Sequence, residues 1–466
     1  EKMATYYARI LFFAFLTKDE VKSLKNIIDS LRANDDNSRI AFNLDLDQDV
    51  LNEIQKYMNP HVLSQLDYKI QNINSLSRDE NKSELERAKI AIKNFTVFSD
   101  SEVVTPSWIA NDLIDIIGVE NLRKLFDKGS SVFDISSKSG EFAAAIYEKM
   151  TLEGNAVSDF RNKIVSLPTS KFGYEFTRKT YEILGLNTDN IIETFNSYDL
   201  LNKIINDSKK AYELIENSNN YLESNIFNDK EGVNMKFDLI IGNPPYQDRG
   251  GSGGNNDAAI YQHFVEFAIS LKPDYCSMII PARWFAAGRE NLLGNFRRNF
   301  LNSSKISDLV VYPNASEIFP NVQIEGGVCY YKYDLKGNYN ETNYSYITEK
   351  NVKKIKRKLN EFDVLIADPV LGNIVKKVDA KMKETNTASV DSIISADTPF
   401  GIASNPKVSK KTPTKVFSKS SPEHNTKLFH IERGKRKVEY VEGSKIKKNA
   451  VDINKDKVFI TGGYGG

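Results

Sequence analysis

Cysteine and histidine are scarce in this 466-residue chain, which contains two Cys and four His. Both cysteines, Cys276 and Cys329, lie inside apolar runs, and the histidines show no spacing typical of metal ligands. A disulfide-stapled fold is therefore excluded, and no metal site is expected. We expect both thiols to be reduced core residues of an intracellular protein.

Long apolar runs and a large net charge are also missing. No run approaches the ~18 apolar residues of a membrane span, no secretory signal is visible, and the net charge is +1. With 40% apolar and 27% charged residues, the composition is typical of a soluble globular protein. Its length favours two or three domains. Since the chain begins at Glu1 without Met and ends on ITGGYGG, we expect a piece of a longer polypeptide.

The charge is distributed unevenly along the chain. Residues 401–466 contain thirteen Lys and two Arg against four Glu and two Asp, a net charge of +9. Such a segment is either simply solvated or a surface that contacts nucleic-acid phosphates.

The most informative stretch is FDLIIGNPPYQ, residues 237–247. Its apolar first half, which ends at Gly242, predicts a buried strand of a parallel sheet. The loop that follows therefore lies at the carboxyl end of a strand, where open α/β sheets place their ligands.

This loop suits the activation of a planar amino group. An exocyclic amine on a base or an amide is a poor nucleophile because its lone pair is delocalised, and two acceptors that hold its hydrogens overcome this. Asn243 offers its side-chain oxygen, and Pro244 offers its carbonyl. Pro244 and Pro245 fix the main chain, and Tyr246 can stack on the planar group. The alternative is a Pro-Pro turn with a surface Tyr, which would need only the prolines.

Asn243-Pro244-Pro245-Tyr246 resembles the catalytic motif of methyltransferases that use S-adenosylmethionine, above all the DNA adenine-N6 methyltransferases. The same motif occurs in protein glutamine methyltransferases and in some RNA guanine methyltransferases. The resemblance implies that these four residues are catalytic and that no metal is required.

A second motif supports the resemblance. The stretch SVFDISSKSGEF, residues 131–142, predicts a strand, a short turn and a helix start, which together can meet a polar ligand. Ile135 and Lys138 depart from the family pattern, which has Pro and Gly there. A Thr105-Pro106 helix start precedes this motif, as in the family. The resemblance places these residues at S-adenosylmethionine: Thr105, Asp134, Ser136, Gly140, Phe142, Glu175 and Asp199.

Two of these acids depend on predicted strands. Residues 172–177, FGYEFT, predict a strand that ends near Glu175, where a carboxylate would hold the ribose hydroxyls. A third strand is predicted in NIIETFNSYDLL, and Asp199 after it would face the cofactor's adenine, with Asp229 as a rival. The alternative for each is an exposed acid at a strand end.

The remaining segments are less specific. Residues 1–95 have a helical pattern, and we find no nuclease constellation in them. The glycine-rich stretch after Tyr246 is either a mobile lid or a plain surface loop. The resemblance implies that the late strand GGVCYYKY supplies a wall of the pocket for the target base, which makes Tyr330 or Tyr331 a candidate, and alternation leaves open which one. Residues from about 349 onward predict a helical stretch followed by a β-rich basic segment.

The motifs run from cofactor loop to catalytic loop to C-terminal recognition segment, the gamma order. The resemblance implies an α/β fold, a Rossmann-like doubly wound sheet with a helical N-terminal extension and a partial β-rich C-terminal recognition domain. The expected domains are residues 1–95, 96–348 and 349–466.

The implied function is site-specific methylation of the N6 amine of a flipped adenine in double-stranded DNA. We expect a cytoplasmic enzyme of a bacterial restriction-modification system, with a nuclease or helicase on the same or a partner chain. Two alternatives stay open: a protein glutamine methyltransferase, and a DNA-binding subunit whose cofactor site has decayed.

Overall fold

The computed structural model describes residues 2–98, 103–218, 237–247, 259–286, 290–320, 322, 324–389, 394, 400–402, 415–432 and 435–456. The chain divides into two compact units, Glu1–Gly372 and Asn373–Gly466. The predicted glycine-rich lid after Tyr246 and the rival acid Asp229 lie outside the described residues.

The first unit is built on a mixed sheet with the strand order β2-β1-β3-β4-β6-β5-β7-β8. Strands β2, β1, β3 and β4 are mutually parallel, whereas β6 runs antiparallel to both of its neighbours, β4 and β5. β7 is parallel to β5, and β8 returns antiparallel to β7. The strands are β1 Ser131–Ser137, β2 Ile164–Pro168, β3 Phe237–Gly242, β4 Tyr275–Pro281, β5 Ile306–Tyr312, β6 Val328–Asp334, β7 Thr342–Thr348 and β8 Asn351–Arg357.

The central strands form where the sequence predicts buried apolar runs. Every residue of β1 and β3 is buried, as expected of parallel strands that are covered on both faces. Their register pairs Val132 with Leu239 and Asp134 with Ile241. This pairing places the carboxyl end of β1 beside the loop that follows β3.

Helices cover both faces of the sheet, which confirms the predicted α/β class. One hydrophobic core contains residues of α7 to α10, and a second contains residues of α11 to α14. The helices are α7 Ser107–Ile117, α8 Val119–Asp127, α9 Glu141–Leu152, α10 Lys171–Leu184, α11 Ser197–Asn206, α12 Ser208–Ser218, α13 Tyr261–Ser270 and α14 Glu290–Asn302.

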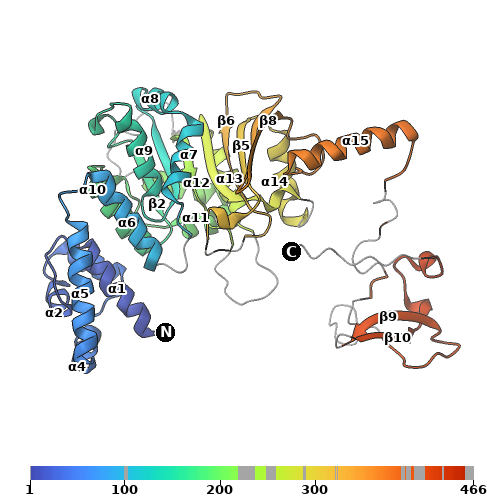
Figure 1. Cartoon of the computed structure of the whole chain (residues 1–466), viewed down its shortest axis with the longest axis horizontal. Helices are drawn as coiled ribbons and strands as arrows, with labels where there is room; N and C mark the ends of the chain where they lie inside the picture. Colours follow the sequence, from blue (N-terminus) through green and yellow to red (C-terminus); the bar gives the residue numbers. More distant parts are fainter. Residues whose placement is uncertain are drawn as a thin grey trace. The chain divides into compact units, whose positions relative to one another are not determined.

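The N-terminal residues are helical, as predicted, and they join the first core. In Figure 1 the helix α6 lies beside α10, and the other N-terminal helices are drawn in blue below them. Phe12, Phe15 and Phe95 all pack their rings on Phe176 of α10, with centroids 5.0 to 6.0 Å apart. The helices are α1 Lys2–Leu16, α2 Leu24–Ser30, α3 Asp35–Asn43, α4 Gln48–Tyr57, α5 Pro60–Ser77 and α6 Glu84–Phe98.

Three predicted elements are wrong. Residues 172–177 belong to helix α10, which Ser170 caps by accepting from the Gly173 amide. The predicted strand before Asp199 is reduced to a single bridge between Ser166 and Ile191. The predicted helix over residues 351–357 is the edge strand β8, because hairpin pairing with β7 overrides a locally helical pattern.

The second unit begins within helix α15, Pro369–Thr385, and contains an antiparallel hairpin of β9 Thr426–Glu432 and β10 Lys435–Val441.

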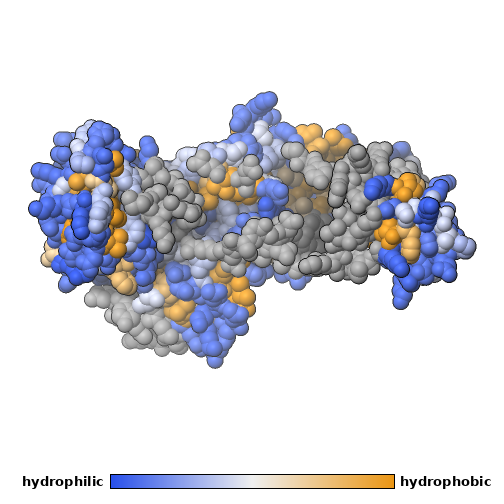
Figure 2. All heavy atoms as spheres, turned by 90° about the horizontal axis from the view of Figure 1, so that it is seen from below, coloured by the Kyte–Doolittle hydropathy of each residue, from blue (hydrophilic) through white to orange (hydrophobic). Residues whose placement is uncertain are grey.

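None of the described helices is both long and apolar enough to cross a membrane. On the face drawn in Figure 2 the described residues are mostly hydrophilic, and the apolar ones form separate patches.

Candidate active site

The loop after β3 is buried at the carboxyl edge of the parallel strands. Asn243 is only 1% exposed, and Pro244 and Pro245 are buried as well. The amide Nδ2 of Asn243 donates to the main-chain carbonyl of Val103, 3.1 Å away. For its Oδ1, the structure records no partner among the described residues. This bond fixes the orientation of the amide and leaves its oxygen as a free acceptor.

The loop between β1 and α9 reaches the same place. Lys138 is buried at 5% exposure, and its Nζ donates to the main-chain carbonyl of Asn243 at 2.7 Å. The sequence marked Lys138 only as a departure from the family pattern. A lysine within a buried loop is itself a signal, because a buried ammonium requires a specific acceptor.

Asp134 and Ser136 line the floor under this loop. The Oδ1 of Asp134 accepts from the Ser136 amide, but its Oδ2 and the Ser136 hydroxyl are buried without a partner among the described residues. Both side chains lie against Gly242, where an added Cβ would come within 2.9 Å of the Ser136 Oγ. Glycine is therefore needed at position 242 for the loop to approach β1 this closely.

Burial raises the pKa of the Asp134 carboxyl well above its usual value, and the nearby charge of Glu141 raises it further. The hydroxyl of Thr105 is also buried and unpartnered, since the helix start at Pro106 has no side-chain cap. Unpaired oxygens on Thr105, Asp134 and Ser136 fit the hydrogen-bonding groups of a polar ligand, such as the amino-acid end of S-adenosylmethionine.

Gly140 and Phe142 have packing roles in this structure. Gly140 adopts a positive φ of 78° at the start of α9, and a Cβ there would lie 3.0 Å from Thr180 of α10. Phe142 is fully buried in the first hydrophobic core. Both residues therefore pack the loop between β1 and α9 against the first hydrophobic core and α10.

Glu175 lies within α10 and not at the end of a strand. Its carboxylate accepts from the Arg39 guanidinium at 3.1 and 3.3 Å and from the Asn43 amide at 2.6 Å. Burial raises the pKa of the Glu175 carboxyl despite these donors. These contacts hold α3 on α10, so they do not bring Glu175 together with Asp134 and Asn243.

Asp199 is exposed in the first turn of α11. Its Oδ2 accepts from the amide of Asn196, the helix-capping residue, at 3.0 Å. The adjacent Ser197 hydroxyl donates to the Ile135 carbonyl of β1 at 3.0 Å. The start of α11 therefore lies at the same edge of the sheet as the catalytic loop, and the role of Asp199 toward a cofactor stays a prediction.

The two candidate tyrosines of β6 point to opposite faces of the sheet. The Tyr330 hydroxyl donates to Asp112 of α7 at 3.1 Å, whereas Tyr331 is fully buried in the second core beside Cys276. Tyr246 packs on that second core too. Tyr331 therefore shares a face with Tyr246, and Tyr330 does not.

Tyr246 itself is partly exposed, but its hydroxyl is buried without a partner among the described residues. Burial raises the pKa of this hydroxyl well above its usual value, with a smaller contribution from Cys329. The phenol thus points its hydroxyl into the protein, while the residue as a whole keeps some exposure.

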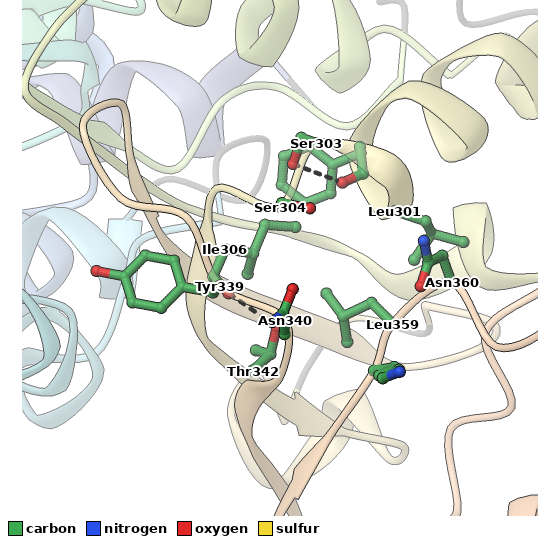
Figure 3. Close-up of a pocket in the computed structure, with 11 residues that line it drawn as sticks. Leu301, Ser303, Ser304, Ile306, Tyr339, Asn340, Thr342, Leu359 and Asn360 are labelled. Atoms are coloured by element: carbon green, nitrogen blue, oxygen red, sulfur yellow. Dashed lines mark hydrogen bonds between the residues drawn. The ribbon is translucent and has the colours of Figure 1, made fainter.

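A separate polar pocket lies away from this site. Figure 3 shows Ser303, Ser304, Tyr339, Asn340 and Thr342 around it, at the starts of β5 and β7. Its volume is about 180 Å³. Because β5 and β7 run in the same direction as β3, their starts lie at the opposite edge of the sheet from the catalytic loop.

The Eco57I restriction-modification methylase family matches residues 65–319, more than half of the chain. The matched range includes the β1 loop and the NPPY loop. A protein of Mycoplasma pneumoniae (strain ATCC 29342 / M129 / Subtype 1) described as an uncharacterized adenine-specific methylase is 37% identical over 177 residues. That match covers 37% of this chain and 39% of the relative.

Three restriction-modification proteins are among the solved structures that this chain matches. The first, from a type I restriction-modification system, has a TM-score of 0.45 at 11% identity, and the match covers 84% of this chain and 82% of the other. The Type ISP enzyme LlaGI, solved with a DNA substrate mimic, scores 0.48 at 11% identity and covers 76% and 33%. The Type IIL enzyme MmeI, solved with DNA, scores 0.43 at 13% identity and covers 76% and 57%.

Proposed function

Because this chain belongs to the Eco57I restriction-modification methylase family, we propose that it transfers a methyl group from S-adenosylmethionine to the N6 amine of adenine in double-stranded DNA. The observation that carries the proposal is the buried amide of Asn243. Its Nδ2 donates to the Val103 carbonyl, which fixes the orientation of the amide and leaves its Oδ1 as the acceptor.

The chemistry of this chain's residues follows from that orientation. Asn243 Oδ1 and the Pro244 carbonyl accept the two hydrogens of the amine, which localises its lone pair for attack. These acceptors are set before the substrate arrives, so their interaction strengthens as the nitrogen becomes positive in the transition state. Tyr246 offers its ring to an adenine taken out of the stack, and its inward hydroxyl takes no part.

S-adenosylmethionine, when bound, supplies an electrophilic methyl group that needs no metal. Thr105, Asp134 and Ser136 would hold its polar groups, because their oxygens are buried and unpartnered among the described residues. An ionised Asp134 is the natural acceptor for an ammonium group. Glu175 is a weaker candidate, since its carboxylate already accepts three hydrogen bonds.

DNA is the proposed partner. Residues 401–466 carry a net charge of +9, which suits contact with phosphates. A cytoplasmic location and a nuclease or helicase on the same or a partner chain are parts of the same proposal, in line with the family's restriction-modification role.

Transfer of radiolabelled methyl groups to long unmethylated duplex DNA tests the function. We expect label in the N6-methyladenine fraction after nuclease digestion. Asn243→Ala should lower the single-turnover rate by about 100-fold or more with DNA affinity nearly unchanged, because the lost interaction forms mainly in the transition state. Label recovered in protein would instead favour the glutamine methyltransferase alternative.

Asn190→Ala is a matched control for the loss of a buried amide. Asn190 is 3% exposed, and its Nδ2 also donates to a main-chain carbonyl, that of Asn162 at 2.8 Å. It lies in the short turn Thr188–Asn190 between α10 and α11. Equal losses of rate in the two variants would mean that Asn243 acts only through stability, and the assigned chemistry would be wrong.

A further inference from the structure

The catalytic loop, residues 243–246, has few main-chain hydrogen-bond donors of its own. Pro244 and Pro245 lack an N–H, so two successive peptide units carry only carbonyl groups. The main chain between Asn243 and Tyr246 can therefore be anchored only by donors from other segments.

Lys138 supplies such a donor. Its Nζ lies 2.7 Å from the Asn243 carbonyl, the short distance of a hydrogen bond from a charged group. That carbonyl belongs to the Asn243–Pro244 peptide, whose nitrogen cannot donate. The Pro244 carbonyl, one residue on, stays available for a substrate amine.

The main chain at Lys138 is held in place by helix α10. The Lys138 carbonyl lies against α10, where a Cβ on Gly173 would come within 3.2 Å of it. In the next residue, the Ser139 carbonyl accepts from the Thr180 hydroxyl of the same helix at 2.7 Å. A lysine fixed at its main chain and buried along its side chain can transmit that rigidity to the loop.

Carboxylates compensate the buried cation. Asp134 and Glu141, at 0% and 1% exposure, flank Lys138 in the β1 loop. The attraction between the Lys138 ammonium and the Asp134 carboxyl, which counteracts part of the rise in the pKa of Asp134, offsets part of the cost of removing the ammonium from water. The Lys138 ammonium is therefore stabilised inside the protein and does not require contact with water.

We propose that Lys138 is a positioning residue, whose ammonium fixes the Asn243–Pro244 peptide and so sets the two acceptors of the catalytic loop. This role rests on the proposed function for its catalytic consequence, but the restraint on the loop is a property of the protein alone. The β1 loop, through Lys138, thus takes part in shaping the acceptor site.

Hydrogen–deuterium exchange of the protein without cofactor or DNA tests the restraint. In a peptide that covers the catalytic loop, the prolines are silent, so the signal reports the amides of Asn243, Tyr246 and Gln247. Lys138→Met keeps the length and removes the donor. Exchange should accelerate roughly 10- to 100-fold, as expected for the loss of a hydrogen bond to a charged group.

Lys179→Met is the matched control. Lys179 is also buried at 8% exposure and donates to a main-chain carbonyl, that of Leu16 at 3.3 Å, on the side of α10 that faces the N-terminal helices. We expect no change in loop exchange in this variant. Lys138→Arg, which retains a cationic donor, should stay within about threefold of wild type and provides a folded comparison if Lys138→Met is unstable.

Single-turnover methylation tests the catalytic consequence. Lys138→Met should lower the rate by at least about tenfold, while DNA affinity changes by less than about twofold, and Lys138→Arg should recover most of the loss. Loop exchange that is unchanged in Lys138→Met, or equally fast in Lys138→Met and Lys138→Arg, overturns the proposal. Faster exchange in a protein whose wild type methylates nothing supports the restraint and refutes the proposed function instead.

Discussion

Replacement of Asp134 by Asn should change how the stability of this protein depends on pH. The carboxyl is fully buried, its Oδ2 has no partner among the described residues, and burial together with Glu141 raises its pKa well above the ordinary value. Asn keeps the acceptor for the Ser136 amide, since Oδ1 has the same position in both side chains. The substitution therefore removes the ionisable group and replaces the buried Oδ2 with an amide NH2 group.

The sign follows from proton linkage. An acid whose pKa is raised by folding binds its proton more tightly in the folded state, so it destabilises the fold as pH rises from the unfolded pKa through the folded one. Below the unfolded pKa this cost is absent. The stability of Asp134→Asn relative to wild type should thus rise with pH, by at most about 1.4 kcal/mol per pH unit for one proton. The new buried N–H groups of Asn add a pH-independent cost of about 1–3 kcal/mol.

Urea unfolding followed by tryptophan fluorescence measures this difference. The two tryptophans, Trp108 and Trp284, both lie in the unit Glu1–Gly372, so the signal reports the unit that contains Asp134. Unfolding free energies of both proteins between about pH 4.5 and 9 should diverge as described. A difference that stays constant across this range would refute the reasoning, because it would mean that Asp134 has the same pKa in both states. Calorimetry on the same variant should also detect weaker binding of S-adenosylmethionine.

Two further predictions concern Tyr246 and Glu175. Tyr246→Phe should preserve extrusion of the target base, measured by 2-aminopurine fluorescence, because the lost hydroxyl is buried and has no partner among the described residues. Tyr246→Ala should instead lose about 1–3 kcal/mol of stacking. Equal loss of extrusion in both variants would contradict this role of the ring. Glu175→Gln should destabilise the protein by about 1–3 kcal/mol in urea unfolding, because it removes one of the two carboxylates that pair with the half-buried Arg39 and leaves only Asp36. Cofactor affinity should stay unchanged in that variant, and a large loss of affinity without a loss of stability would restore the predicted ribose contact.

The sequence predicted the centre of the sheet well because its signal there is local. The runs that became β3, β4 and β5 are apolar over most of their length, as is typical of strands covered on both faces. The NPPY loop was found for the same reason, since its four residues are consecutive. Its position after β3 then placed it at the ligand-binding edge without further information.

Prediction failed at α10 because residues 172–177 were too short a window to reveal a helix. Residues 172–177 alternate aromatic with small or polar residues, which imitates a strand, and Phe176 packs on the N-terminal helices while Tyr181 faces Ser166 of β2. Over its full length of 14 residues α10 is amphipathic, and residues 172–177 alone are too few to show this helical period. The wrong strand also gave Glu175 a wrong position, at the end of a strand. Its actual partners, Arg39 and Asn43, lie 136 and 132 residues away in sequence.

The geometry of the catalytic loop depends on residues that no local pattern could connect. Val103 and Lys138, which hold the Asn243 side chain and main chain, are separated from it by 140 and 105 residues. The sequence nevertheless contained the reason for such contacts. Two prolines remove the donors that would let the loop bond to itself, so the stiffness that makes Asn243-Pro244 useful for catalysis must come from donors and acceptors elsewhere. Lys138, where the resemblance expects a glycine, meets this requirement. Its departure from the family pattern in the cofactor loop is thereby explained by the hydrogen bond that it donates to the catalytic loop.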